Sequence, residues 1–152
     1  MPGFELIDNA EFKAVNSIFK NGGVLFAHGF EKIRKNFHVR EFEKKVSIYF
    51  KSKHALAVTS GTAAIKIALK ALNVKPGDEV ITQAFNFIAT IEAILDLGAI
   101  PIMANVDESL NMNPEDLKKI ITKKTKAIIP VHMLGVPAKL DQIIKIAQKK
   151  KN

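Results

Sequence analysis

The chain has no cysteine among its 152 residues, which excludes disulfide bonds and thiolate chemistry. It has no apolar run long enough to cross a membrane. Its opening residues, MPGFELIDNAEF, lack the basic start and apolar core of a signal peptide. We therefore expect a cytoplasmic protein with no membrane partner.

Several common site motifs are missing as well. There is no GxGxxG after a strand, no GxxxxGK(S/T) and no GxSxG, so dinucleotide, P-loop and hydrolase sites lose their main support. The four histidines lack the spacing of metal ligands, so no metal site is expected. An unrelated nucleotide-binding α/β domain is an alternative that these absences disfavour.

The composition that remains is that of a globular domain with a real core, because 47% of the residues are hydrophobic and 25% are charged. The formal charge of +8 suits nucleic acid, an anionic substrate or an ordinary solvated surface. The lysines are spread along the chain and no aromatic residues are interleaved with them. A solvated surface is therefore favoured, and no nucleic-acid partner is expected.

From His54 onward, apolar periodicity predicts strands and helices in alternation. The expected strands are residues 55–59, 79–82, 100–104 and 127–131. Four helices are expected in this part of the chain. One follows Ser60, one covers 88–97 up to Gly98, one begins at Asn113-Pro114 and one begins near Lys139. Their inward residues include Ile65, Leu69, Leu72, Leu140, Ile143, Ile144 and Ala147. Two earlier helices are also expected. One covers 11–20, and the other has Val39, Phe42, Val46 and Tyr49 on one face. This alternation predicts an α/β fold around a mainly parallel sheet.

The most informative segment is Ala55–Leu72, ALAVTSGTAAIKIALKAL, because a strand, a small-residue turn and a helix follow one another. The first N–H groups of a helix lack partners within it and carry partial positive charge, so such a turn binds anions. Gly61 lets a ligand approach the backbone, and the hydroxyls of Ser60 and Thr62 suit a phosphate. An ordinary helix cap is the alternative explanation of these residues.

A second loop, Gln83–Phe87, follows the next strand and carries two aromatic rings. Ligands of parallel sheets bind beyond the carboxyl ends of the strands, where this loop, Ser60–Thr62 and His132–Gly135 are expected to meet. We expect Phe85 to lie in the core. Phe87 is expected to stack on a planar heteroaromatic ligand, which together with a phosphate turn suits a phosphorylated planar cofactor.

Four segments, TSGTAA, PGDEVIT, FNFIATIEAILDLGAIPIMANVD and TKAIIPVHMLG, occur in an order that resembles the DegT/DnrJ/EryC1/StrS family. These are pyridoxal-phosphate (PLP) dependent aminotransferases of sugar biosynthesis with the fold-type I architecture. The resemblance covers nearly the whole chain. MPGFEL and GGVLFAHGFEKIRKNFHVREFEKK are most similar to the subgroup that makes 8-amino-3,8-dideoxy-octulosonate.

The resemblance implies roles for particular residues. Cofactor-binding residues by this resemblance are Ser60, Gly61, Thr62 and Ala63 at the phosphate and Phe87 on the pyridine ring. The loop at His28-Gly29 resembles a segment near the active site of the family's dimer. His132 stands close to the cofactor in the family, and a satisfied core histidine is the alternative. Asn86 replaces the more usual Thr or Ser.

The family's catalytic lysine, which forms the Schiff base, and its acid on the pyridine nitrogen have no counterpart here, so no catalytic residue is assigned. Lys66 and Lys70 lie on an outward helix face, and Asp141 suits a helix N-terminus. The chain stops at Asn152, directly after a helix, where the pattern would continue with a strand. We therefore expect an N-terminal part of the fold-type I large domain, inactive alone.

Within that part, residues 1–53 are expected to form a helical segment with an active-site loop, and 54–152 an incomplete PLP-binding domain. The whole enzyme is expected to be a homodimer that moves an amino group from an amino acid, glutamate by resemblance, to a keto sugar. The alternative is a non-catalytic interaction or regulatory protein derived from that fold. An open sheet edge also predicts that the chain associates or is marginally stable.

Overall fold

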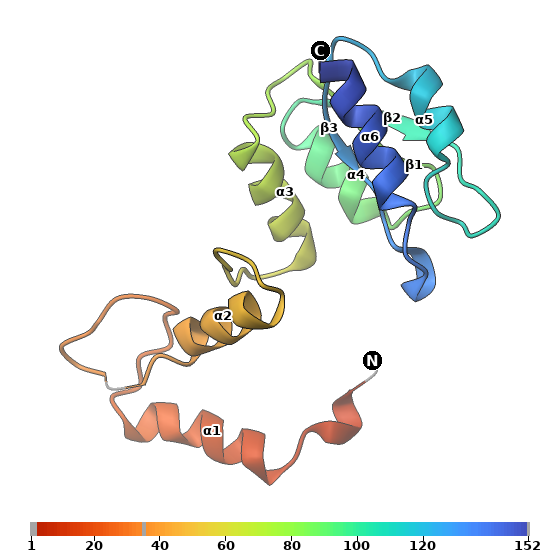
Figure 1. Ribbon diagram of the computed structural model, residues 1–152. Helices are drawn as coiled ribbons and strands as arrows, with labels where there is room; N and C mark the ends of the chain where they lie inside the picture. The colour runs from red at the N-terminus through yellow and green to blue at the C-terminus, as the bar shows by residue number, and fades with distance from the viewer. Residues whose placement is uncertain (1–2, 35, 152) are drawn as a thin grey trace. The chain divides into compact units, whose positions relative to one another are not determined.

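The computed structural model describes residues 3–34 and 36–151, drawn in Figure 1. The chain divides into two compact units, Met1–Ala57 and Val58–Asn152. Each unit has its own set of elements, so each is described by itself.

The first unit contains a 3-10 turn, η1 (Phe4–Leu6), and two helices, α1 (Asn9–Lys20) and α2 (His38–Tyr49). Both predicted helices are confirmed. Helix α1 begins two residues earlier than expected because Asp8 caps it: its carboxylate accepts the Ala10 N–H at 2.6 Å, and Glu11 accepts the Asp8 N–H at 2.8 Å. Neither helix has a buried residue.

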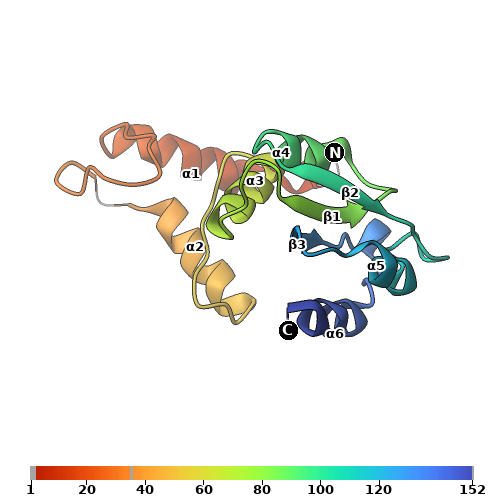
Figure 2. The ribbon, with the colours of Figure 1, turned by 90° about the horizontal axis from the view of Figure 1, so that it is seen from above.

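The second unit is built on a three-stranded parallel sheet of β1 (Glu79–Gln83), β2 (Ile100–Ala104) and β3 (Thr125–Ile129). The strand order is β2-β1-β3, so β1 is central, and Figure 2 shows the three strands side by side. In the register, Ile81 of β1 lies opposite Ile102 and Ile128. The predicted α/β fold with a parallel sheet is confirmed.

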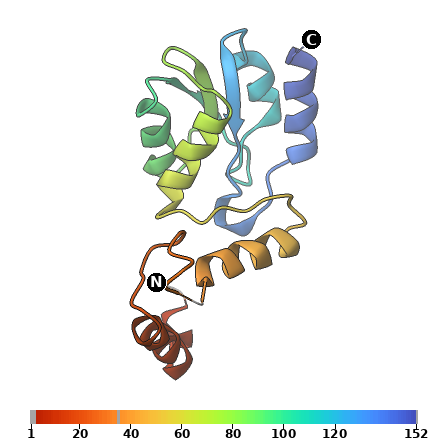
Figure 3. The ribbon, with the colours of Figure 1, turned by 90° about the vertical axis from the view of Figure 1, so that its left-hand side faces the viewer.

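Helices cover both faces of this sheet in three layers, as Figure 3 shows. On one face, α3 (Gly61–Ala71) and α4 (Ile88–Leu95) pack around a core cluster that includes Leu69, Val80 and Ile94. On the other face lie α5 (Pro114–Ile120) and α6 (Leu140–Lys151), and the turn η2 (Met133–Gly135) follows β3. The core cluster there contains Ile81, Met112, Leu117, Ile143 and Ile146 among others.

The predicted strand at 55–59 is wrong, since this segment is irregular. A strand needs a neighbouring strand to take up its backbone groups, and no strand in residues 3–34 and 36–151 pairs with this segment. The Ala57 N–H instead donates to the carboxylate of Glu43 on α2 at 2.9 Å. Leu56, expected in a buried strand, is 65% exposed.

Three aliphatic residues predicted to face inward are exposed: Leu72 after α3, and Leu140 and Ile144 on α6. Helix α6 buries Ile143, as predicted, together with Ile146, so its packed stripe is rotated from the predicted one. The reason is that α6 lies beside α5 and leaves its other apolar side at the outer edge of β3, where Leu72 also lies. The predicted helical periodicity is correct, but periodicity does not tell which element packs against each face of a helix.

Candidate functional site

The N-terminus of α3 has the backbone geometry that the turn at Ser60 predicts. Ser60 is extended (φ −161°, ψ 164°), and its Oγ accepts the Ala63 N–H at 3.1 Å, so the ordinary capping role is present. Among the described residues, the N–H groups of Gly61 and Thr62 have no acceptor. A Cβ on Gly61 would meet no atom within 4 Å, which leaves the approach to these two donors open.

Phe87 is the residue before α4, and its side chain is 75% exposed, as a stacking ring requires. The prediction that Phe85 lies in the core is wrong. Phe85 is 52% exposed, because the loop after β1 turns outward before α4 begins. Asn86 is held within the loop, where its Nδ2 donates to Thr82 Oγ1 at 3.0 Å. The loop that carries Phe87 is therefore anchored to the end of β1.

Ser60 and Phe87 occupy equivalent places on two neighbouring helices. Helices α3 and α4 pack against each other on the same face of the sheet. Helix α4 follows β1, and α3 precedes β1, so both helices run back along the sheet and begin at the carboxyl ends of the strands. This is the edge where parallel sheets bind their ligands.

The sequence analysis missed the residue that joins the loops at this edge, Gln83. Its amide is fully buried and every hydrogen-bonding position is used: Nε2 donates to the carbonyls of Phe85 (3.1 Å) and Leu110 (2.9 Å). Its Oε1 accepts the N–H groups of Met112 (3.2 Å) and Val131 (3.0 Å). The available signal was the polar pair Thr82 and Gln83, which follows the apolar pair Val80 and Ile81 at the end of the strand.

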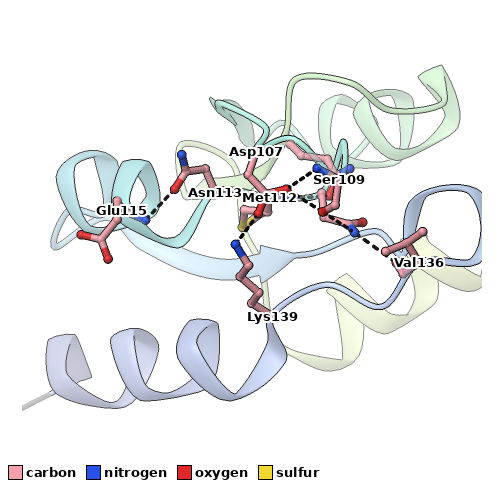
Figure 4. A network of polar contacts seen from close by, with 9 residues as sticks. Asp107, Ser109, Met112, Asn113, Glu115, Val136 and Lys139 are labelled. Atoms are coloured by element: carbon pink, nitrogen blue, oxygen red, sulfur yellow. Dashed lines mark hydrogen bonds and ion pairs between the residues drawn. The ribbon is translucent and has the colours of Figure 1, made fainter.

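A second polar network connects the loops after β2 and β3, as Figure 4 shows. Asp107 Oδ2 lies 2.8 Å from Lys139 Nζ, and its Oδ1 accepts the Ser109 N–H at 2.9 Å. The ion pair with Lys139, followed by the hydrogen bonds from Ser109, lowers the pKa of Asp107 to about 2. Buried Asn111 accepts the Met133 N–H at 2.8 Å and donates to the Val136 carbonyl at 3.1 Å.

His132 directly precedes Met133, whose N–H donates to Asn111, and it is exposed, so the core alternative is wrong. Its Nδ1 accepts the Ala138 N–H at 2.9 Å, which leaves Nε2 to carry the proton of the neutral ring. Leu134, two residues further on, has a left-handed backbone (φ 51°) and a side chain that is 84% exposed. The loop is thus held firmly from both ends while it presents polar and apolar groups outward.

In the first unit, His28 Nε2 lies 3.7 Å from Glu43 Oε1, the carboxylate that also accepts the Ala57 N–H. The loop around His28 is held by Arg34, whose guanidinium donates to the carbonyls of Phe26 and Ala27. The His28 side chain is 49% exposed and remains available at the surface of this unit.

The lysines near the α3 turn give no substitute for a catalytic lysine. Lys66 is engaged in an ion pair with Asp96 at 2.6 Å, and Lys70 is exposed in the last turn of α3. Asp141 lies in the first turn of α6, as expected. Within residues 3–34 and 36–151 no cluster of metal-ligating side chains occurs, and no helix is long and apolar enough to span a membrane.

The model of one protein family, the DegT/DnrJ/EryC1/StrS aminotransferase family, matches residues 7–151. The chain belongs to this family. The DegT-family match covers both units, including the Ser60 turn, the Phe87 loop and the His28 loop.

Relatives of known sequence and structure agree with this assignment. The chain is 43% identical over 117 residues to the spore coat polysaccharide biosynthesis protein SpsC of Bacillus subtilis, covering 76% of this chain and 30% of that protein. It is 47% identical over 97 residues to UDP-N-acetyl-3-dehydro-alpha-D-glucosamine 3-aminotransferase of Acidithiobacillus ferrooxidans, covering 63% and 26%.

A solved structure, Spr1654 of Streptococcus pneumoniae in its PLP form, superposes with a TM-score of 0.85 at 31% identity, covering 95% of this chain and 35% of that one. The cofactor of these DegT-family neighbours is therefore pyridoxal phosphate. The chain spans about a third of the length of the relatives that it matches.

Proposed function

We propose that this chain supplies the phosphate-binding and ring-stacking part of a PLP-dependent aminotransferase. The observation that carries the proposal is the pair of open N–H groups at Gly61 and Thr62 beside an uncovered Gly61, on the helix that packs against α4. Phe87 at the start of α4 adds an exposed ring at the same edge of the sheet. Family membership supports the choice of ligand.

In this proposal each residue has a limited task. Gly61, Thr62 and Ala63 bind the cofactor phosphate with backbone N–H groups, and the Ser60 hydroxyl exchanges its cap for a phosphate oxygen. Phe87 orients the pyridine ring by stacking. The cofactor, when bound, supplies the electron sink that amino-group transfer requires. Gln83 and Asn86 hold the Phe87 loop in position.

The substrates that we propose are an amino-acid donor, glutamate, and a keto sugar. The name of the Acidithiobacillus relative, a 3-aminotransferase of a dehydro sugar nucleotide, supports a keto-sugar acceptor. The 152 residues contain neither the lysine motif nor the pyridine-pairing acid of the family. We therefore propose that this chain by itself does not catalyse transamination, and that residues 54–152 form an incomplete cofactor domain.

A second copy is the partner that we propose for the first unit. Residues 3–34 and 36–57 contain no buried hydrophobic side chain, whereas Phe12, Val15, Phe19 and Phe42 are each more than half exposed. Apolar surface on that scale is typical of protein–protein interfaces. A homodimer would cover it, and sedimentation velocity at several concentrations measures whether one forms.

The test of the proposed function is binding of 4′-deoxypyridoxine 5′-phosphate, an analogue without the aldehyde that would react with surface lysines. We expect saturable binding, observed by ligand fluorescence, that Phe87→Ala weakens by about tenfold. Phe85→Ala is the matched control, because Phe85 lies in the same loop and is also exposed. Equal losses in both variants, or no saturable binding, would contradict the proposal.

The alternative of a non-catalytic interaction protein predicts a different result. It requires a stable partner and no saturable binding of the analogue. Affinity capture on the immobilised chain tests for a stable partner, and elution with the analogue tests whether the analogue binds. Together the two steps separate the two functions.

A further inference from the structure

The side chain of Asn86 lies between two buried hydroxyl groups in the loop that carries Phe87. Its Nδ2 donates to Thr82 Oγ1 at 3.0 Å, and its Oδ1 accepts the Thr90 hydroxyl at 3.4 Å. Thr82 is fully buried at the end of β1, and Thr90 is 4% exposed in the first turn of α4. Buried hydroxyl groups without partners are costly, so both threonines favour a polar side chain at this position.

The hydrogen bonds of Asn86 have a fixed direction. A threonine hydroxyl has one proton, and Thr82 donates its proton to the Ile129 carbonyl of β3 at 3.1 Å, an oxygen that can only accept. The Thr82 oxygen can therefore only accept from Asn86, which places the Nδ2 group on that side and Oδ1 toward Thr90. We name this chain of three hydrogen bonds, which runs from α4 to β3, the Asn86 relay.

Phe87 lies between the two ends of the relay and has little support of its own. It is the N-cap residue of α4 and has no side-chain oxygen, so this helix begins without a side-chain cap. Its carbonyl accepts the Thr90 N–H at 3.2 Å. Because its ring is 75% exposed, the direction of the ring depends on the backbone, which Asn86 holds on one side and Thr90 on the other.

We propose that Asn86 is a positioning residue, which orients the Phe87 ring through the relay. This inference rests on the proposed function for its ligand, because the oriented ring is the one that stacks on the pyridine ring of the cofactor. In that function the phosphate is bound by Gly61 and Thr62 on a different helix, α3. Replacement of Asn86 therefore affects recognition of the planar ring and leaves recognition of the phosphate unchanged.

The amide has a property that the more usual serine or threonine lacks at this position. Its donor and its acceptor are two separate atoms, whereas a hydroxyl has one oxygen for both partners. Asn86→Ser, with a shorter side chain and one polar atom, keeps at most part of the relay. Its effects should lie between those of the parent chain and of Asn86→Ala.

Amide hydrogen exchange in the free chain tests the relay without any ligand. We expect Asn86→Ala to speed exchange of the Thr90 N–H, which donates to the Phe87 carbonyl, by about tenfold. Asn113→Ala is the matched control, because it removes an asparagine that accepts the Glu115 N–H and caps α5 on the opposite face of the sheet. The control should leave exchange of the Thr90 N–H unchanged.

Two ligands separate orientation of the ring from general damage to the site. The analogue 4′-deoxypyridoxine 5′-phosphate has a planar ring and a phosphate, whereas inorganic phosphate has no ring. We expect Asn86→Ala to weaken binding of the analogue by about fivefold and binding of inorganic phosphate by less than about twofold. Nuclear magnetic resonance shifts of the Gly61 and Thr62 amides report both ligands. Equal losses for the two ligands would overturn the proposal.

A double variant tests whether Asn86 acts through Phe87. In the Phe87→Ala background there is no ring to orient, so Asn86→Ala should cause no further loss of analogue affinity. The circular dichroism of the bound analogue at saturation depends on how the two rings lie relative to each other. It should change in Asn86→Ala and stay the same in Asn113→Ala. Additive losses of affinity in the double variant would contradict the positioning role.

The exchange and binding measurements distinguish failure of this inference from failure of the proposed function. If the parent chain does not bind the analogue, the proposed function is contradicted, while faster Thr90 exchange in Asn86→Ala would still support the orientation of Phe87 by the relay. If the parent chain binds the analogue and Asn86→Ala changes neither Thr90 exchange nor analogue affinity, the proposed function stands and the positioning role is overturned.

Discussion

At the scale of single residues, the amide of Gln83 has the largest structural role at the carboxyl edge of the sheet. It joins the end of β1 to the loop before α5 and to the chain that follows β3, with four hydrogen bonds and no exposed surface. Buried donors and acceptors left without partners cost more than the bonds themselves contribute. Its replacement therefore affects several loops at once.

We predict that Gln83→Met, which preserves length and removes both polar atoms, destabilises the protein by about 2–4 kcal/mol. Thr82→Val is the matched control in the neighbouring buried position, where Thr82 Oγ1 donates to the Ile129 carbonyl at 3.1 Å. That change should cost about 1 kcal/mol. Urea unfolding followed by circular dichroism measures the stability of both variants. Equal losses of stability would contradict the role of Gln83 in joining several loops.

The ionisation of Asp107 makes the stability of the folded protein depend on pH. Its pKa is lowered from the ordinary 3.8 to about 2, so the folded state favours the ionised form. The stabilisation is complete above about pH 4 and is lost as the pH falls through about 2. Since the carboxylate is 14% exposed and its partner Lys139 is 54% exposed, solvent reduces the effect to at most about 2 kcal/mol.

We predict that Asp107→Asn is less stable than the parent chain at pH 6 and equally stable near pH 2. The reason is that the parent loses the charge of Asp107 over that range and the variant has none to lose. Thermal unfolding between pH 2 and pH 6 measures the difference. Asp96→Asn, which breaks the exposed pair with Lys66, should give a small difference. A constant gap between Asp107→Asn and the parent would contradict the linkage.

At the scale of elements, the end of α4 depends on one glycine. Gly98 has φ +68°, its N–H donates to the Leu95 carbonyl at 2.8 Å, and the Ala99 N–H donates to the Ile94 carbonyl at 3.3 Å. This is a Schellman motif, which requires a left-handed residue after the helix. The sequence predicted a helix to about Leu97 with Gly98 as its cap; α4 ends at Leu95 with Asp96 as its cap, and Gly98 closes the turn that follows.

We predict that Gly98→Ala destabilises the second unit more than Gly77→Ala does. Both glycines have positive φ, so both changes introduce about 1–2 kcal/mol of backbone strain. Only at Gly98 would the new Cβ also approach the Pro76 ring, at 3.1 Å. Thermal melts of the two variants rank them, and equal shifts would show that the contact with Pro76 relaxes freely.

At the scale of the whole molecule, the two units differ in how they are stabilised. Every buried hydrophobic side chain of the described residues lies between Leu69 and Ile146, within the second unit. The first unit has capped helices and exposed apolar faces instead. Burial of apolar surface is the dominant favourable contribution to folding, so stability resides in the second unit.

We predict that a fragment of residues 58–152 retains the cooperative melting transition of the full chain. The isolated segment 1–57 should melt without a cooperative transition, because helices of about a dozen residues are marginal alone in water. Circular dichroism melts of the two fragments measure this. Loss of the transition in 58–152 would mean that the first unit contributes to the stability of the second.

Much of the fold was predictable from local pattern. Strand 100–104, the helix capped by Asn113 and the cap at Ser60 are all as expected, because each depends on residues adjacent in the chain. The strand at 55–59 failed because strand formation depends on a partner far away in sequence. Phe85 and Ile144 failed because periodicity gives a face and does not say what covers it.

By itself, the sequence determined the α/β alternation, the turn at Ser60–Ala63 with Phe87 on the next loop, and the resemblance to the DegT family. These are local properties: caps, turns and motifs act over a few residues. Only the tertiary structure decided that Gln83 and Asn111 join three loops, that one sheet edge carries a proline and that the other faces an apolar groove. These properties depend on which elements become neighbours, and that is decided by the packing of the whole second unit.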